Sequence, residues 1–441
     1  MLSDTTAIRE KLKEIYDDFA ANITQIYGRQ DLHLAIDLVY HSPLKFVFDG
    51  RTIEKAYPEV LVIGDTRTGK TQAAEALLKH YGCGASAQAE AMSYSGLVGG
   101  CQKMFDTQWD VTWGKLPQNN RRLLIIDEAS GMDEKLLGNL SSIRSSGIAT
   151  IEKIAAAKTE SKTRILWLSN PKQKITVGQF SSGISVIESL CSQPEDIARW
   201  DMAIIVAKDD VDVYAHRSNN GKVVPHRFTA QRCHDLVLWA WTREKSEVFL
   251  SKETCDACYV LGKKMSEKYD SGFTLVHEAE QPLKLARLAT ALAARLFSSP
   301  DGNKLVVEPC HVEYIYEYLN RVYDSRHFGY DTYCLNSKSG NSIIDLEDIQ
   351  EFMVRIKEVG CNQFLMLEKM RLKDIEEFLG VTTDEAKTML ARLLQNNALK
   401  RLGGDYYRKS QQFNEMLRAF VTEGRERRRL QRMKEKEEDG L

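Results

Sequence analysis

The sequence predicts an α/β protein, and three observations support this fold class. The first half of the chain contains short apolar runs that are typical of strands buried on both faces of a parallel sheet. The first run leads through a glycine-containing loop into a helical pattern, which is the order of a β–α unit. From residue 231 onward, helical patterns predominate. The apolar runs occupy residues 60–63, 123–126, 164–169 and 203–206.

Length and composition indicate two or three domains, because 441 residues with 43% hydrophobic content can form several cores. The net charge of −2 gives no long-range attraction to nucleic acid, so any nucleic-acid surface must be local. No apolar run reaches the roughly 18 residues that a membrane span needs. The N-terminal segment is charged and lacks the apolar core of a signal peptide, so we expect a cytoplasmic protein with no membrane partner.

The nine cysteines are scattered along the chain and are expected to be reduced core residues. Cys255 and Cys258 form a single CxxC pair, and with Cys233 and His234 they suggest a zinc site. The pair lies in a helical stretch without a second close pair of ligands, which favours packing cysteines.

The first 45 residues are predicted to form a helical lead-in. Apolar residues recur at helical spacing from residue 5 to residue 26, and a second helix is expected over residues 32–40. Residues 46–57 are expected to form a hairpin or loop before the first buried strand.

A phosphate-binding loop is the strongest motif in the chain. The two glycines of this motif let the backbone turn its N–H groups inward at the positive end of the following helix, which makes an anion site. Lys70 would contact the β- and γ-phosphates of ATP or GTP, and the Thr71 hydroxyl would bind Mg²⁺. The motif comprises Gly64, Asp65, Thr66, Arg67, Thr68, Gly69, Lys70 and Thr71.

Polar residues flank the other buried strands. Asp127 and Glu128 follow the second apolar run, at the edge where parallel sheets bind ligands, so Asp127 is expected to hold Mg²⁺ through water and Glu128 to polarise the attacking water. Asn170 follows the third run and would orient water or contact the γ-phosphate, although Asn-Pro is also an ordinary turn. Arg199 precedes the fourth run, and by itself it is most simply a surface residue in a local ion pair.

In this order, the segments resemble the AAA+ ATPase core of the minichromosome-maintenance (MCM) family of replicative helicases, over residues 20–325. The family's phosphate loop usually reads Gly-Asp-Pro-Gly-Thr-Ala-Lys-Ser, and its arginine-finger box reads Ser-Arg-Phe-Asp-Leu. The resemblance covers the family's lead-in segment, phosphate loop, start of the helix-2 insertion, Walker B acids, presensor hairpin with sensor 1, and arginine-finger box. These lie at residues 26–28, 64–71, 93–97, 127–132, 148–171 and 196–202.

The resemblance implies that Asn170 is sensor 1 and that Arg199 is a finger for the γ-phosphate of a neighbouring subunit. Such a finger implies a closed ring of identical subunits, and the family suggests a hexamer. The implied function is that of an ATP- and Mg²⁺-dependent helicase that unwinds single-stranded or forked DNA during replication, with a mobile element as its conjectured source. The alternative is a non-helicase AAA+ switch, helicase loader or remodelling ATPase that acts on protein partners.

Two insertions are expected within this core. The alanine-rich composition of residues 148–162 favours an exposed helix, but the resemblance implies a β-hairpin that points into the ring channel. There Lys153, near the tip, with Lys158 and Lys162, would contact DNA phosphates. The helix-2 insertion is expected over residues 99–120, as a short hairpin whose alternating tryptophans either contact DNA or pack against a neighbour.

Two departures from the family stand out. The lid helix at residues 283–297 has Glu280 at the position where a sensor 2 arginine is expected, so Lys284 or Arg287 would have to substitute. Only about 25 residues precede the match, so the usual N-terminal domain of the family is expected to be missing.

The C-terminal part is expected to be a separate winged helix-turn-helix. Asp384 and Glu385 at the start of its recognition helix argue against tight reading of the major groove, so replication proteins are an equal candidate for its partner. The expected domains are a helical lead-in at 1–45, an AAA+ α/β core at 46–230, a helical lid at 231–335, a linker at 336–345, the winged helix-turn-helix at 346–421 and a charged tail at 422–441.

Overall fold

The computed structural model forms two compact units. The first contains residues 1–177 and 182–334, and the second contains residues 178–181 and 335–441. The structure describes residues 2, 4–103, 109–152, 156–172, 175–180, 182–191, 193–211, 224–338, 352–353, 355–356, 360, 363–395, 398–403, 406–410 and 413–422.

The first unit opens with helices, as predicted. Helix α1 (Thr5–Phe19) is capped by the Asp4 carboxylate, which accepts a hydrogen bond from the backbone N–H of Ala7 at 2.8 Å. A π-helical turn, η1 (Ala20–Thr24), and helix α2 (Gln30–Tyr40) follow. The next segment is a small antiparallel hairpin of β1 (Phe46–Phe48) and β2 (Arg51–Ile53), within the residues for which a hairpin or loop was expected.

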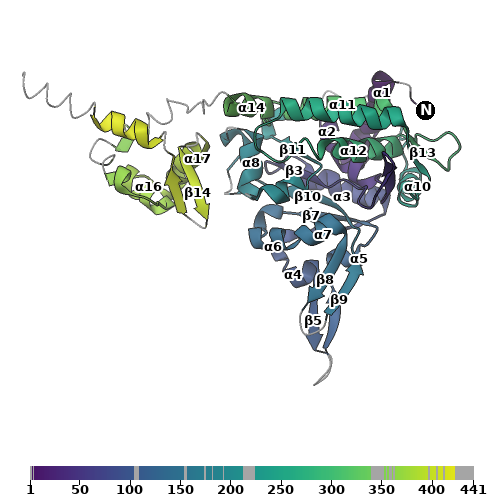
Figure 1. Cartoon of the computed structure of the whole chain (residues 1–441), viewed down its shortest axis with the longest axis horizontal. Coiled ribbons are helices and arrows are strands. Elements are labelled where there is room, and N and C mark those ends of the chain that lie inside the picture. Colours follow the sequence, from purple (N-terminus) through teal and green to yellow (C-terminus); the bar gives the residue numbers. More distant parts are fainter. Residues whose placement is uncertain are drawn as a thin grey trace, which may run out of the picture. The chain divides into compact units, whose positions relative to one another are not determined.

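The core of this unit is a five-stranded parallel sheet with the order β11-β3-β10-β7-β4 (Figure 1). Every residue of its central strands is buried, because helices cover both faces. The fifth strand, β4, was not predicted, since its sequence Ala-Ser-Ala-Gln lacks an apolar run and it lies at an edge of the sheet. The strands are β3 (Val60–Gly64), β4 (Ala85–Gln88), β7 (Leu123–Asp127), β10 (Arg164–Ser169) and β11 (Met202–Val206).

Helices follow the sheet strands and then form a helical region. Helix α3 (Lys70–Tyr81) follows β3, and short helices connect the other strands. Between α10 and α13, strands β12 (Val248–Leu250) and β13 (Leu305–Val307) pair in parallel. The further helices of this unit are α4 (Tyr94–Leu97), α5 (Lys115–Gln118), α6 (Glu134–Asn139), α7 (Ser141–Ser146), α8 (Gly183–Leu190), α9 (Pro194–Ala198), α10 (Ala230–Trp241), α11 (Lys252–Lys268), α12 (Gln281–Arg295) and α13 (Pro309–Tyr323).

Two antiparallel hairpins extend from the core in the same direction (Figure 1). Strands β5 (Gly99–Lys103) and β6 (Trp109–Trp113) form the first hairpin, within the expected helix-2 insertion. Strands β8 (Ile148–Glu152) and β9 (Ala156–Glu160) form the second, and β8 contacts β5. The helix that the composition of residues 148–162 favours does not form, because Ala149 and Ile151 are buried at the alternating spacing of a strand. The residues between the paired strands lie outside the described part of the chain.

The second unit has its own apolar core, which includes Phe352, Phe364 and Phe413. Helix α14 (Tyr330–Lys338) leads from the first unit to this one, while α16 (Leu372–Leu379), α17 (Thr383–Gln395) and the antiparallel pair of β14 (Leu399–Gly403) and β15 (Tyr406–Lys409) follow. The tail beyond residue 422 and most of the expected linker lie outside the described residues. None of the described helices is long and apolar enough to cross a membrane.

Gly64 at the end of β3 lies against the backbone of β11 with no room for a side chain. A Cβ atom there would lie 2.0 Å from the carbonyl oxygen of Val206 in β11, so Gly64→Ala is expected to lower the free energy of unfolding by about 1–3 kcal/mol. Thermal unfolding checks this result, with Gly178→Ala as the control because nothing lies within 4 Å of its added Cβ. Equal midpoints for the two variants would contradict the prediction.

Candidate functional site

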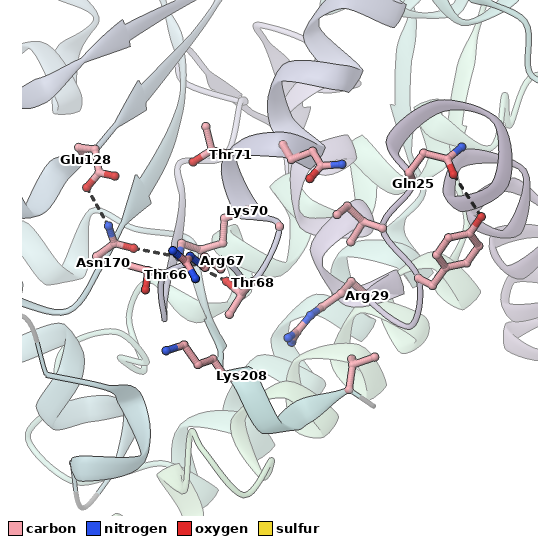
Figure 2. Close-up of a pocket in the computed structure, with 15 residues that line it drawn as sticks. Gln25, Arg29, Thr66, Arg67, Thr68, Lys70, Thr71, Glu128, Asn170 and Lys208 are labelled. Carbon is pink, nitrogen blue, oxygen red and sulfur yellow. Dashed lines mark hydrogen bonds between the residues drawn. The ribbon is translucent and has the colours of Figure 1, made fainter. Parts of the chain in front are cut away.

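A pocket of ≈ 590 Å³ lies where β3 ends and α3 begins (Figure 2). It opens at the carboxyl edge of the sheet, which is where ligands bind in parallel α/β folds. Residues from the N-terminal segment, the predicted phosphate loop and three strand ends line this pocket: Gln25, Ile26, Tyr27, Arg29, Thr66, Arg67, Thr68, Gly69, Lys70, Thr71, Gln72, Glu128, Asn170, Lys208 and Val211.

The loop has the curled backbone that the motif predicts. Gly69, with φ +87°, caps α3, and Arg67 also has a left-handed conformation, with φ +63°. Arg67 occupies the position at which the family usually has glycine, so this chain holds an arginine where the left-handed backbone costs about 1–2 kcal/mol. The Thr68 hydroxyl donates to the carbonyl oxygen of Asp65 at 2.8 Å, which closes the turn.

Lys70 lies inside the curl of the loop. Its ammonium group donates to the carbonyl oxygens of Gly64 and Asp65 at 2.8 and 2.6 Å and to the Asn170 side-chain oxygen at 3.1 Å. Burial lowers the pKa of Lys70 to about 8, although the acids Glu128 and Asp127 oppose that shift. The charged form of Lys70 is therefore less stable here than in water, and a bound anion such as a phosphate would stabilise it.

Asp65 acts differently from the rest of the loop. Its carboxylate is 4% exposed and accepts hydrogen bonds from the backbone N–H groups of Val177 at 2.8 Å and Lys208 at 3.1 Å. The side chain thus anchors the loop to two neighbouring segments and does not line the pocket. Because its side chain is engaged in this way, Asp65 could contact a cofactor only through its backbone.

Glu128 and Asn170, which follow two of the predicted strands, lie beside Lys70 in the pocket, as Figure 2 shows, whereas Asp127 is not among the lining residues. The Asn170 amide donates to the Glu128 carboxylate at 2.8 Å, while its oxygen accepts from Lys70. Burial and then the charge of Asp127 raise the pKa of Glu128, which makes this carboxylate a better proton acceptor. Asp127 is buried, with one oxygen accepting the backbone N–H of Glu128 at 2.8 Å.

Arg199 lies at the opposite edge of the sheet from this pocket. The first residue of β11 pairs with the first residue of β3, and Arg199 precedes β11, whereas the phosphate loop starts at the far end of β3. A five-residue strand spans about 16 Å, so Arg199 does not line the pocket of its own chain. Its guanidinium donates to the Glu195 carbonyl oxygen and pairs with the Asp196 carboxylate at 3.5 Å.

The lysines of the β8–β9 hairpin that the structure describes differ in their exposure to solvent. Lys158 is exposed on β9, and Lys153 lies outside the described residues. Lys162 lies at the base, where it is 8% exposed and pairs with Glu54 at 3.2 Å and Glu160 at 3.6 Å. These ion pairs favour a structural role for Lys162 over contact with DNA.

The two candidates for sensor 2 are engaged within their own chain. Lys284 is 2% exposed and donates to the carbonyl oxygens of Trp200 and Leu275, both at 2.9 Å. Arg287 pairs with Asp201 at 2.8 Å and donates to the Lys55 carbonyl oxygen at 2.9 Å. These contacts fix α12 against the start of β11, and neither residue lines the pocket.

The CxxC pair, Cys255 and Cys258, is buried on α11 as free thiols. Burial raises the pKa of Cys258 far above its ordinary value, which disfavours the thiolate that zinc binds. His234 contacts the Cys83 thiol at 3.4 Å instead. In the described ranges, no three His, Cys, Asp or Glu side chains gather as a metal site would require.

Sequence reasoning missed two basic residues of the pocket. Arg29 lies in it and pairs with Asp210 at 2.9 Å, while Lys208 points into it from the segment after β11 (Figure 2). A signal for Lys208 was present, because it follows the fourth predicted strand at the same edge as Glu128 and Asn170. Arg29 had no such signal, since its place depends on how the N-terminal helices pack.

The sheet, the curled loop and the buried lysine define a P-loop nucleotide-binding α/β domain. A sequence model described as the MCM P-loop domain matches residues 4–225, and the chain belongs to the MCM family. It therefore carries an MCM-family AAA+ ATPase domain, followed by a helical C-terminal region. A search of curated proteins found no match.

Proposed function

We propose that this chain is the motor subunit of a homohexameric ring that hydrolyses ATP to move along DNA and unwind it during replication. The observation that carries the proposal is the separation of Arg199 from its own phosphate loop by the length of β3. If Arg199 contacts a γ-phosphate, that phosphate must belong to another subunit, and a repeated head-to-tail contact around a ring provides this arrangement. Membership of the MCM family supports the same arrangement.

The residues of the pocket have complementary roles in the proposed hydrolysis. Lys70 and the loop N–H groups bind the phosphates, and Glu128 accepts a proton from the attacking water. Asn170, which contacts both Lys70 and Glu128, holds that carboxylate in place. Arg199 of the adjacent subunit stabilises the charge that develops on the γ-phosphate.

Mg²⁺ fits the donor set of this site. The Thr71 hydroxyl lines the pocket, and Asp127 is a buried carboxylate whose charge already raises the pKa of Glu128. Oxygen donors of this kind suit Mg²⁺, and we assign Thr71 and Asp127 to hold it. Bound there with ATP, the ion would neutralise charge on the phosphates.

The β8–β9 hairpin is the proposed contact with DNA. It lies directly between α7 and β10, and β10 ends next to Asn170, so a single strand joins the hairpin to the nucleotide pocket. Lys158 and Lys153 would bind phosphates without regard to sequence, as translocation requires. The buried Lys162 would stabilise the hairpin base.

The second unit is proposed to be a winged helix-turn-helix. Helices α16 and α17 are followed directly by the two-stranded β14–β15 wing, and Tyr407 in the wing pairs with Met370. Acidic residues begin α17, and Asp384 pairs with Lys387 at 3.1 Å, so the recognition helix presents little free positive charge there. We propose that this unit contacts replication proteins.

Strand displacement on a forked duplex tests the function. We expect the wild-type protein to release the labelled strand only with ATP and Mg²⁺. Lys158→Ala should lower the rate about tenfold at low salt, because the lost phosphate contact weakens DNA binding, and the difference from wild type should narrow as salt rises, since the variant makes fewer salt-sensitive contacts. Lys158 is exposed, so its replacement should leave ATP hydrolysis without DNA unchanged. ATP turnover that is indifferent to DNA but stimulated by a protein would support a remodelling ATPase instead.

A further inference from the structure

A buried ionic cluster connects the arginine-finger segment to the base of the β8–β9 hairpin. It consists of Arg144, Glu59, Asp196, Trp167 and Trp200, and we call it the Arg144 cluster. We infer that this cluster positions Arg199 for the neighbouring subunit's ATP and transmits movement of the hairpin to it. The inference rests on the role in the adjacent site that is proposed above for Arg199.

All three nitrogens of the Arg144 guanidinium donate hydrogen bonds, which together hold the group in one orientation. Its Nε donates to Glu59 at 2.6 Å, and two further nitrogens donate to the carboxylate and backbone carbonyl of Asp196 at 3.2 and 3.1 Å. The rings of Trp167 and Trp200 lie 5.5 and 5.3 Å from its central carbon. Its side chain is fully buried, so the loss of one carboxylate would leave the buried guanidinium with a single anionic partner.

Asp196 connects the cluster to the finger. The same carboxylate oxygen that receives Arg144 also accepts the Ser141 hydroxyl at 2.8 Å and lies 3.5 Å from the Arg199 guanidinium. Asp196 is on α9, and Arg199 is the C-cap residue that follows the end of that short helix. The position of the finger therefore depends on where Arg144 holds α9.

The cluster is also connected to the base of the hairpin. Arg144 lies on α7, and the C-cap of this helix, Gly147, directly precedes β8. The Gly147 carbonyl accepts a hydrogen bond from the backbone N–H of Ser161, just after β9. Lys55 donates to the Arg144 carbonyl at 2.6 Å and pairs with Glu59 at 3.3 Å. Because α7 forms one root of the hairpin, a force on the hairpin would act on the guanidinium that holds Asp196.

Asp196→Asn tests the positioning role, since it keeps the shape of the side chain and removes its charge. In rings made only of this variant, we expect kcat for ATP to fall by on the order of 10²-fold, as for a catalytic group misplaced by about 1 Å, while nucleotide affinity is kept. Ser141→Ala is the milder variant, because it removes one hydrogen bond to Asp196 and should lower kcat a few-fold with an unchanged KM.

Mixed rings separate positioning from a general structural defect. Lys70→Ala subunits lack a working phosphate loop but carry an intact finger, so mixing them with Asp196→Asn subunits should restore hydrolysis at about a quarter of the interfaces. The reference is the mixture of Lys70→Ala with Arg199→Ala. If the reference recovers activity and the Asp196→Asn mixture does not, the cluster does not position the finger and the inference is overturned. If the reference itself stays inactive, the finger is not supplied by a neighbour and the proposed function fails first.

Arg144→Lys tests the connection to the hairpin. Lysine keeps the charge but lacks the planar, rigid set of donors by which Arg144 holds Glu59, the Asp196 carboxylate and the Asp196 backbone carbonyl in one fixed arrangement. We expect hydrolysis without DNA to persist at a reduced rate and its stimulation by forked DNA to be lost. Stimulation equal to that of the wild-type protein would show that the hairpin does not act through this cluster.

Discussion

ATP hydrolysis should nearly disappear when Lys70 is replaced by alanine, with kcat/KM lower by on the order of 10³-fold. The replacement removes the only ammonium group that donates to the loop carbonyls of Gly64 and Asp65 and to Asn170 among the described residues. It would also remove the hydrogen bond from Lys70 to the side-chain oxygen of Asn170, whose amide donates to Glu128. Steady-state kinetics with thermal unfolding as a check on folding measure this outcome, and a loss below tenfold would contradict it.

The pKa of Lys70 adds a pH dependence to this prediction. Burial lowers that pKa to about 8, so the free protein loses the charge as pH rises through this value, while bound phosphate favours the charged form. The affinity for ATP should therefore be full well below pH 8, fall to about half near pH 8 and weaken by roughly 20-fold between about pH 7.5 and about pH 9.5. Titration with a fluorescent ATP analogue measures this change. Lys70→Arg is the control, because arginine stays charged and its affinity should not change with pH in this range.

Arg199→Ala should lower kcat by on the order of 10³-fold without weakening ATP binding. The reason is its place at the edge of the sheet opposite the phosphate loop, away from the pocket of its own chain. Single-turnover hydrolysis and equilibrium binding together separate the two effects. Arg199→Lys should recover part of the rate, since it restores the charge without the planar set of donors.

Weaker binding in Arg199→Ala, with an unchanged rate for bound ATP, would contradict this prediction. It would place the residue in nucleotide binding and not in transition-state stabilisation. Thermal unfolding is the check on folding. If Arg199→Ala unfolds at the same midpoint temperature as Gly178→Ala, which adds a methyl group in open space, a loss of the folded structure is excluded as the cause.

The parts of the fold that depend on local sequence could be predicted. Four of the five sheet strands are continuous apolar runs, and the phosphate loop is a contiguous motif whose glycines set its backbone. Asn170 and Glu128 could be placed together because the carboxyl ends of parallel strands share one edge of the sheet. β4 was missed, since an edge strand needs no apolar run.

Features that depend on distant partners could not be predicted. Arg144 lies in the polar sequence Ser-Ser-Ile-Arg-Ser-Ser, which is typical of an exposed helix, yet its partners are 85 and 52 residues away. Lys284 and Lys162 appeared available for phosphate, but their ion pairs and carbonyl contacts form only in the folded chain. The hairpin at residues 148–162 followed from resemblance, because its own composition favours a helix.

Electron microscopy of ATP-bound Glu128→Gln on forked DNA tests the central claim most directly. This variant should keep ATP bound, because Gln retains the shape of Glu128 but cannot accept the proton from water. We expect a closed six-subunit ring with Arg199 of each subunit at the next subunit's γ-phosphate and the β8–β9 hairpins facing DNA in the channel. A particle without a ring, or a ring whose channel excludes DNA, would contradict the account.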